Sequence, residues 1–379
     1  MSASTHSELP VERDASDGAS EGSCAPAGCP AVSRVGEVIG DLEIESRIAE
    51  GAMGCVYRAR RRANGERVAV KILHPDAAAE PVAVERFKRE YETAFGFDHP
   101  HIVRVRGFGE TPDGSYYMTM ELLDGEPLSS ILSREGKLAP ERALRIVCQM
   151  ASAIEHAHSY GVIHRDLKPA NIFLERGPGG TERVKLLDFG SVKLQLETGP
   201  KLTAFGTTVG SPSYMSPEQA EGLTELDPRA DVFSLAAVAY EMLTGAVAFD
   251  GETAAEVLSK ILRGTFTPAS VREPSLPLGI NLVLAAGLRR DKASRTGSAR
   301  EFAEGLLRVF GLEPDVDGFA SASLEAIRGA LDSRRSRDIT VRVEQESADD
   351  EAGGSSAVVW ISACAATLVV SAVVAYLVL

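Results

Sequence analysis

The sequence has few cysteines and no excess of basic residues, and each shortage excludes a class of protein. Five cysteines among 379 residues, scattered and odd in number, do not form a disulfide framework and favour a reducing compartment. Lys and Arg total 40 against 54 Asp and Glu, a net charge of −14. Because nucleic-acid binding depends on a basic field, we expect no nucleic-acid partner. The composition, 44% hydrophobic and 25% charged, is that of an ordinary globular chain.

Residues 1–36 have almost no bulky apolar side chains and consist largely of Ser, Ala, Gly, Pro and acidic residues. Such a segment cannot bury enough surface to offset the entropy of ordering, so we predict a disordered leader. It contains no basic stretch followed by an apolar core, so we do not expect a secretory signal.

Residues 357–379 are 23 residues without one charge. A helix of that length measures about 34 Å, enough for a hydrocarbon core of about 30 Å, and predicts a transmembrane helix. Residues 311–356 would then be a juxtamembrane linker with one short helix near 320–335. A stripe of small residues on the predicted span allows a homodimer, although chance produces such stripes often. Its members are Ala363, Thr367, Ser371 and Ala375.

The first part of the remaining chain indicates strands joined by tight turns. Gly51 and Gly54 bracket one turn, where backbone amides can approach phosphates because no Cβ intervenes. Lys71 lies in the apolar strand predicted over 68–73, which is costly unless its charge has a partner. Glu90, on a helix predicted from about Val82, is a candidate partner, although it could equally be a solvated helix residue.

A second group of polar residues follows a predicted helix that begins at Pro140 and ends at Gly161. The loop after it carries the run His164-Arg165-Asp166-Leu167-Lys168-Pro169-Ala170-Asn171. Asp188 comes 17 residues after Asn171, directly behind another apolar strand. Two oxygen donors together with phosphates are what Mg²⁺ prefers.

Taken together, these motifs resemble the eukaryotic-type protein kinase family, in particular its bacterial serine/threonine kinases, from Leu42 to about Val309. The resemblance implies an α+β, bilobal fold over about 39–310. A small antiparallel-sheet N-lobe with one key helix would span about 39–122. A larger, mainly helical C-lobe would span about 124–310, and the transmembrane helix would follow the linker.

The resemblance also implies the site residues. Asp166 would orient the substrate hydroxyl and accept its proton, and Lys168 would stabilise the transferring phosphoryl group. Asn171 and Asp188 would hold Mg²⁺ or Mn²⁺. The residues implied for ATP are Ile48, Ala49, Glu50, Gly51, Ala52, Met53, Gly54, Cys55, Val56, Ala69, Lys71, Glu90, Met120, Glu121 and Leu123. Of these, Lys71 would pair with Glu90, and 120–123 would form the adenine-binding hinge.

Three further features follow from the same resemblance. Glu218 and Arg295 would form a buried ion pair, and Asp231 would brace the catalytic loop from a buried helix. Thr207 and Thr208 are the best-placed regulatory sites, because a phosphate there could pair with Arg165. The alternative is that these threonines are ordinary loop residues.

We therefore expect an ATP-dependent serine/threonine protein kinase that acts on protein substrates. It would be a single-pass protein of the cell membrane with a cytoplasmic kinase domain, activated by autophosphorylation. The alternative is a pseudokinase that acts as a membrane-tethered scaffold. The departures from the family pattern are Ala49 for the first loop glycine, Ser211 for a threonine and Ser216 for an alanine. None of them removes a catalytic group.

Overall fold

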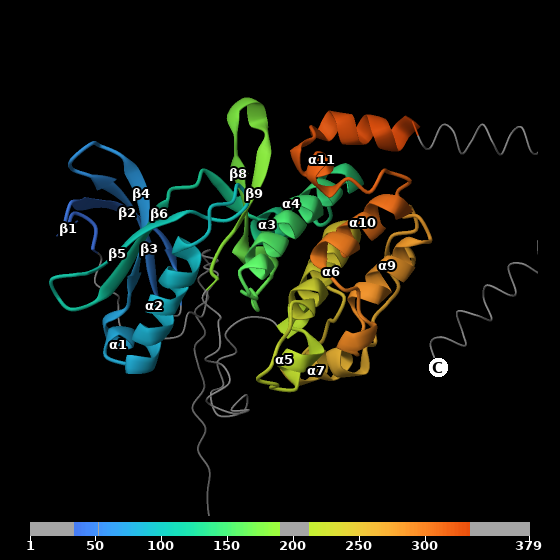
Figure 1. The fold of residues 1–379 in the computed structure, drawn as a ribbon, viewed down its shortest axis with the longest axis horizontal. Coiled ribbons are helices and arrows are strands. Elements are labelled where there is room, and N and C mark those ends of the chain that lie inside the picture. Colours follow the sequence, from blue (N-terminus) through green and yellow to red (C-terminus); the bar gives the residue numbers. More distant parts are fainter. Residues whose placement is uncertain (1–33, 52, 190–211, 334–379) are drawn as a thin grey trace, which may run out of the picture. The chain divides into compact units, whose positions relative to one another are not determined.

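A six-stranded antiparallel sheet forms the first part of the fold in the computed structural model, which describes residues 34–51, 53–189 and 212–333. Its strand order is β1-β2-β3-β4-β6-β5 (Figure 1). The strands are β1 (Val38–Ile39), β2 (Leu42–Glu50), β3 (Gly54–Arg61), β4 (Arg67–Leu73), β5 (Val105–Glu110) and β6 (Tyr116–Glu121). The predicted Asn64-Gly65 turn joins β3 to β4, with Gly65 at a φ of 72°.

Alternation of buried and exposed residues explains why these segments are strands. Along β3, Cys55, Tyr57 and Ala59 are buried on one face and pack with Val68 and Val70 of β4. Successive strand residues point to opposite faces, so the residues between them lie on the other side of the sheet. The two faces of β3 therefore belong to two different environments.

Two helices follow β4, namely α1 (Pro75–Ala78) and α2 (Pro81–Phe95). Each begins with proline at its first position, where the missing N–H is not needed. Helix α2 packs against β5 and β6, and Phe87 joins Leu73 and Met118 in a small buried cluster. This packing points Glu90, which is only 7% exposed, toward the sheet. It is the single long helix predicted for the N-lobe.

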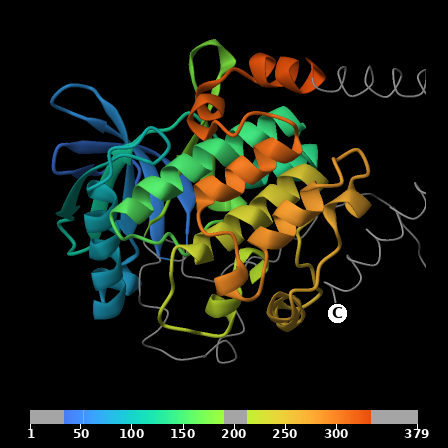
Figure 2. The same cartoon turned by 45° about the vertical axis from the view of Figure 1, so that its right-hand side comes forward.

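The second lobe is mainly helical. Its helices are α3 (Leu128–Glu135), α4 (Pro140–Ser159), α5 (Pro217–Ala220), α6 (Arg229–Thr244), α7 (Ala254–Arg263), α8 (Ala269–Arg272), α9 (Ile280–Gly287), α10 (Ala299–Val309) and α11 (Val316–Ser321). Short 3₁₀ turns are η1 (Pro169–Asn171), η2 (Pro178–Gly180), η4 (Pro212–Tyr214) and η5 (Lys292–Ser294). Figure 2 shows α4 (green), α6 (yellow) and α10 (orange) packed side by side. Helix α6 is buried on nearly every face and ends, as predicted, at Gly245, which has a φ of 75°.

A three-stranded antiparallel sheet carries the loops that hold the polar motifs. Its order is β7-β8-β9, formed by β7 (Gly125–Pro127), β8 (Ile172–Arg176) and β9 (Glu182–Leu186). The run from His164 to Asn171 enters β8, and Asp188 follows β9. Because β8 and β9 are antiparallel neighbours, the start of β8 lies beside the end of β9, and the two motifs are close together at that end of the sheet.

The chain continues to pack on the second lobe beyond residue 310, where we predicted a linker to begin. Leu312, Val316, Ala320 and Ile327 belong to the main hydrophobic core, and residues 324–333 are helical. Gln149 of α4 donates a hydrogen bond of 2.8 Å to the carbonyl of Ala320. Apolar residues spaced over two short helices therefore bury a face that the sequence did not mark as part of the domain.

Among the residues that the structure describes, no helix combines the length and the apolar character needed to cross a bilayer. The predicted span 357–379, most of the predicted leader and the regulatory threonines lie outside the described residues.

Candidate active site

The glycine-rich turn joins β2 to β3 as a closed hairpin tip. The amide of Gly51 donates to the carbonyl of Gly54 at 2.9 Å. A Cβ on Gly54 would lie 2.2 Å from the backbone oxygen of Ile72, so only glycine allows this approach of β3 to β4. Ala52 lies outside the described residues. The predicted turn is therefore present, and Gly54 is its sterically required glycine.

The other residues predicted to contact ATP line the strands around this turn. Ile48, Ala49 and Glu50 end β2, whereas Val56 pairs with Lys71 across β3 and β4. Ala69 is buried and lies opposite Met120 on β6.

The predicted hinge, residues 120–123, begins in the last two residues of β6 and continues past the end of that strand. The side chain of Glu121 is held by Lys185 Nζ at 2.7 Å and by the amide of Arg104 at 2.8 Å. Those contacts occupy its side chain, and its own amide donates to the carbonyl of Arg104 at 3.0 Å. The amide of Leu123 makes no hydrogen bond within the described part of the chain. The segment 121–123 can thus offer backbone groups to a heterocycle.

Lys71 is the centre of a three-residue charge cluster. Its Nζ lies 2.5 Å from Glu90 Oε1 and 3.2 Å from Asp188 Oδ1. Burial by itself would lower the pKa of Lys71, but the carboxylates of Asp188 and Glu90 outweigh it and raise that pKa. The Lys71 charge in turn lowers the pKa of Asp188. The predicted Lys71–Glu90 pair is therefore present, and it draws in Asp188 as well.

The loop between α4 and β8 holds a second cluster around Asp166. Lys168 Nζ lies 2.8 Å and 3.0 Å from the two carboxylate oxygens of Asp166. Asn171 Nδ2 donates to Asp166 Oδ2 at 2.9 Å and to its backbone carbonyl at 2.7 Å. The Asp166 side chain is 40% exposed, so a carboxylate held in one orientation still faces solvent. It can act as a hydrogen-bond acceptor for a hydroxyl or as a general base.

Backbone hydrogen bonds join the two clusters. The amide of Leu187 donates to the carbonyl of Asn171 at 2.9 Å, and His164 Nε2 donates to the carbonyl of Leu187 at 2.9 Å. Asp188 therefore follows a residue that is fixed directly to the Asp166 loop. Two lysines, three carboxylates and one amide, from β4, α2, the Asp166 loop and the segment after β9, make up the two joined clusters.

Asp231 of α6 braces the loop that carries Asp166, as predicted. Its oxygens accept the amides of His164 at 2.8 Å and Arg165 at 2.9 Å, and His158 Nε2 at 2.8 Å. Burial alone would raise the pKa of Asp231, but these hydrogen bonds outweigh it and hold the pKa below its usual range. The brace fixes Arg165 at a φ of 69°, a conformation that is strained for a residue with a side chain.

Phe189 anchors the segment that carries Asp188. Its side chain is 1% exposed, and its ring centroid lies 4.6 Å from that of His164 and 5.0 Å from that of Phe97. Contacts of this kind between aromatic rings stabilise beyond simple burial. They position the carboxylate of Asp188 toward Lys71.

Asn171 and Asp188 fit a divalent cation. Because the Asn171 amide nitrogen donates to Asp166, the acceptor that remains is its amide oxygen, which takes part in no hydrogen bond within the described residues. Asp188 offers a carboxylate that is 51% exposed and has a lowered pKa. Hard oxygen donors of this type suit Mg²⁺ or Mn²⁺.

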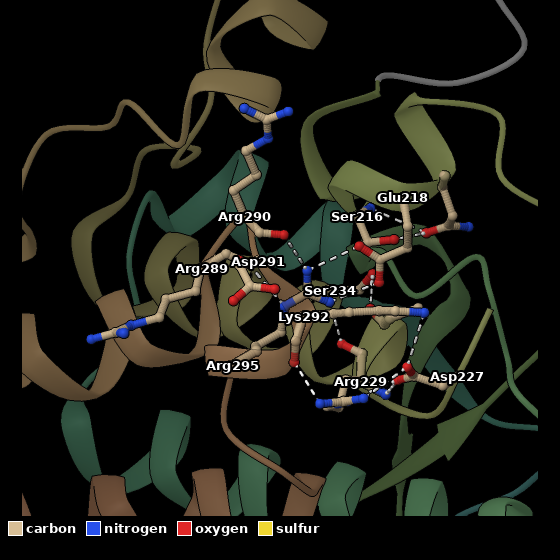
Figure 3. Close-up of polar contacts among 12 residues, drawn as sticks. Ser216, Glu218, Asp227, Arg229, Ser234, Arg289, Arg290, Asp291, Lys292 and Arg295 are labelled. Atoms are coloured by element: carbon tan, nitrogen blue, oxygen red, sulfur yellow. Dashed lines mark hydrogen bonds and ion pairs between the residues drawn. The ribbon is translucent and has the colours of Figure 1, made fainter. Parts of the chain in front are cut away.

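The segment beginning at Pro212 is held by the predicted buried ion pair, drawn in Figure 3. Arg295 forms a fork to both oxygens of Glu218, at 2.8 Å and 2.9 Å, and donates to three backbone carbonyls as well. Gln219 Nε2 reaches back to the carbonyl of Arg165 at 2.7 Å. The segment is thus bonded both to the core and to the Asp166 loop.

Arg165 is not neutralised within the described residues. Its guanidinium forms no ion pair there, and its buried Nε has no hydrogen-bond partner in that part of the chain. Burial lowers the pKa of Arg165, against a smaller opposite effect of Asp231. A partly buried cation in the catalytic loop, without a counter-charge in the described residues, is a position that an anion can occupy.

Some residues of the site were not assigned by the sequence analysis. Gln219 and the ring contacts of Phe189 carry no local signal in the sequence, because their partners are far away in the chain. His74 was missed as well, although it directly follows the strand that carries Lys71. Its amide donates to the carbonyl of Met53 at 2.9 Å, and its Nε2 donates to the carbonyl of Gly51 at 3.1 Å.

Comparison with known proteins gives the class that this geometry defines. The model of the protein kinase domain matches residues 42–309. The chain is 39% identical over 264 residues to the serine/threonine-protein kinase pkn3 of Myxococcus xanthus, which covers 68% of this chain and 48% of that protein. It is 36% identical over 275 residues to the serine/threonine-protein kinase PknB of Mycobacterium tuberculosis, which covers 72% and 43%. The chain thus spans about half the length of these curated relatives.

The fold agrees with a solved kinase domain. The crystal structure of the Mycobacterium tuberculosis PknI kinase domain aligns with a TM-score of 0.57 and 29% identity, covering 73% of this chain and 98% of that one. The chain belongs to the protein kinase family. The bilobal α+β fold predicted from the sequence is confirmed.

Proposed function

We propose that the protein is an ATP-dependent kinase that phosphorylates serine and threonine in other proteins. The observation that carries this proposal is the simultaneous contact of Lys71 with Glu90 and Asp188, beside an Asp166 fixed by Lys168 and Asn171. The relatives named as serine/threonine-protein kinases support serine and threonine as the residues that are phosphorylated. Lys168 is the lysine that serine/threonine kinases carry near the catalytic aspartate.

ATP would bind between the glycine-rich turn and the hinge. Lys71, held in place by Glu90, would bind the α- and β-phosphates, and backbone amides of the turn would cover them. The backbone of Glu121 and Leu123 would hold adenine, with Ala69 and Val56 as apolar walls and Met120 at the back. Mg²⁺ held by Asn171 and Asp188 would neutralise phosphate charge when bound.

The substrate hydroxyl would lie against Asp166. Because Lys168 and Asn171 fix this carboxylate, it orients the hydroxyl without a conformational search and accepts its proton as the phosphoryl group transfers. Lys168 also carries a positive charge next to the position of transfer, where negative charge spreads over the phosphoryl oxygens.

A pseudokinase scaffold is the alternative, and a specific observation argues against it. Scaffolds of this fold usually lose one catalytic position. Here Lys71, Glu90, Asp166, Asn171 and Asp188 are all present, and Phe189 is packed inward so that Asp188 contacts Lys71. A scaffold does not require that arrangement.

We further propose that phosphorylation of Thr207 and Thr208 activates the enzyme. A phosphate carries about −1.5 to −2 charges at neutral pH and would supply the anion that the partly buried Arg165 lacks within the described residues. In a phosphate-mapping experiment on active protein, we expect phosphate on one or both threonines, with activity at least about tenfold lower in Thr207→Val/Thr208→Val. Full activity of the double variant would contradict this regulation.

Attachment to the cell membrane through residues 357–379, with the kinase domain in the cytoplasm, remains part of the proposal. Its basis is the run of 23 uncharged residues. Full-length protein should stay in the membrane fraction after alkaline carbonate washing. Replacement of Val370 and Val374 with Arg should release it, because charges at the bilayer centre are costly. The possible homodimer through the same span is tested by crosslinking in these membranes.

Incubation of the purified full chain with ATP, Mg²⁺ and a mixed protein substrate tests the activity itself. Phosphoamino-acid analysis should recover phosphoserine and phosphothreonine. Phosphotyrosine as the main product, or transfer to small molecules alone, would contradict the proposed substrate class.

A further inference from the structure

Three chemically different metal-binding side chains gather beside the glycine-rich turn. A carboxylate oxygen of Glu50, the thiol sulfur of Cys55 and a ring nitrogen of His74 all lie within 4.8 Å of one another. They come from the end of β2, the start of β3 and the residue after β4. No other group of three such side chains occurs among the described residues. Glu50 and Cys55 were predicted to lie at the ATP site, but the kinase mechanism proposed above assigns no step to the side chain of Glu50, Cys55 or His74.

Each of the three groups has a lone pair available. The carbonyl of Gly51 only accepts hydrogen bonds, so Nε2 of His74 must carry the proton, and Nδ1 of the neutral ring is then unprotonated. Arg47 binds Oε2 of Glu50 at 2.8 Å, and Oε1 is left over. The Cys55 thiol makes no hydrogen bond within the described part of the chain. A histidine that ligates through one nitrogen and donates its other N–H to a backbone carbonyl is the usual arrangement in metal sites.

We propose that Glu50, Cys55 and His74 form a binding site for Zn²⁺. Sulfur and imidazole donors favour zinc and disfavour Mg²⁺, which separates this site from the oxygen donors Asn171 and Asp188. Zinc bonds of about 2.0–2.3 Å in a tetrahedral site place ligand atoms about 3.3–3.8 Å apart, so side-chain rotations that bring them about 1 Å closer suffice. The buried Cys55 would lie on the inner side, and the exposed Glu50 leaves room for water as fourth ligand.

Zinc at this position would fix the glycine-rich turn. Glu50 and Cys55 are cross-strand neighbours that flank the turn, and His74 already bonds to two of its carbonyls. A metal joining all three would prevent the turn from adjusting to the phosphates of ATP. This consequence rests on the proposed kinase function, whereas the metal site itself does not.

Cobalt is the probe, because Co²⁺ bound to thiolate gives an intense near-ultraviolet charge-transfer band that requires no enzyme activity. The full chain is titrated with CoCl₂ in a background where the cysteines outside the described residues are removed, namely Cys24→Ser, Cys29→Ser and Cys364→Ser. We expect the protein to bind one equivalent of Co²⁺ and Zn²⁺ to abolish the charge-transfer band. Excess Mg²⁺ should change neither the amount of bound Co²⁺ nor the band.

Variants assign the band to these residues. Cys55→Ala should remove it, and His74→Gln and Glu50→Gln should each weaken Co²⁺ binding at least about tenfold, as loss of a ligand does. Cys148→Ala, which removes the other buried cysteine, is the matched control and should keep the band. If Cys55→Ala fails to fold, His74→Gln and Glu50→Gln still test the site. Both residues are at least partly exposed, so we expect these two variants to fold. Absence of the band, or an unchanged band in His74→Gln, overturns the site.

The kinase consequence has its own readout. Zn²⁺ added in the presence of excess Mg²⁺ should raise the KM for ATP in the background protein. In His74→Gln, Zn²⁺ should leave the KM for ATP at the value that this variant has without zinc. A cobalt band without this change in KM would support the site and overturn the effect on the turn. A chain without any kinase activity would overturn the proposed function and leave the cobalt result standing.

Discussion

Replacing Glu218 with glutamine tests how far the buried ion pair stabilises the second lobe. The guanidinium of Arg295 has no exposed surface, and it binds both Glu218 oxygens (Figure 3). Glutamine keeps the shape of the side chain but removes its charge, and it turns a donor group toward the guanidinium. Arg295 would then be a buried cation without a counter-charge, held by backbone carbonyls, by the Phe233 ring 5.2 Å away and by the one amide oxygen that remains.

The expected loss is large for a single substitution. Removing one partner of a buried ion pair costs about 3–5 kcal/mol, because the remaining charge stays desolvated. At about 2–4 °C per kcal/mol for domains of 150–250 residues, the Tm should fall by at least about 6 °C. The exposed pair of Arg308 and Glu304, spaced at i and i+4, is the matched control. Glu304→Gln should cost about 0.3–0.5 kcal/mol and change the Tm by less than about 2 °C.

Thermal unfolding followed by circular dichroism measures both variants under one buffer condition. A third variant, Glu218→Met with Arg295→Met, removes both charges. Its loss of unfolding free energy should be smaller than the sum of the losses caused by Glu218→Met and Arg295→Met separately. Equal, small Tm changes in Glu218→Gln and Glu304→Gln would refute the argument from burial. So would simple additivity in the double variant.

Two other predictions concern the N-lobe and its neighbourhood. Gly54→Ala should lower the Tm and weaken ATP binding, because its Cβ would lie 2.2 Å from a backbone oxygen. Gly51→Ala, whose Cβ would lie 3.5 Å from the nearest atom, should change the Tm much less. Equal Tm changes of the two variants in calorimetry would contradict this. Burial lowers the pKa of His99 and of His101 to about 4, so the unfolded chain binds more protons between pH about 6.5 and 4. The free energy of unfolding should therefore fall as the pH decreases through that window, and His99→Asn/His101→Asn should flatten the slope in urea titrations at several pH values.

The order of motifs along the chain was sufficient to predict the fold and most of the contacts in the site. Lys71 on an apolar strand required a partner, and Glu90 on the next helix supplies it. Asp231 in a helix buried on nearly all sides likewise required hydrogen bonds, and it accepts three. In both cases the cost of an unpaired buried charge predicted that a partner exists, and the resemblance to protein kinases indicated which one.

Other contacts between distant segments were not predicted. Asp188 pairs with Lys71 across 117 positions in the chain, and this pairing depends on how the two lobes meet. The packing of Ile327 and its neighbours on the core of the second lobe was not predicted, because the apolar residues of a short helix do not show which surface they pack against. His74 bonds to the glycine-rich turn through a strand register that no local pattern specifies.

The most direct test of the central claim is phosphate transfer by the full chain and by Asp166→Asn, measured over a range of ATP concentrations. Asparagine is the same size but cannot accept the proton of the substrate hydroxyl, so kcat should fall by about 10²–10³-fold or more. The KM for ATP should change little, since the proposed ATP contacts lie on other residues. Equal kcat values for the two proteins, or a loss confined to the KM for ATP, would contradict the role of Asp166 and with it the proposed kinase mechanism.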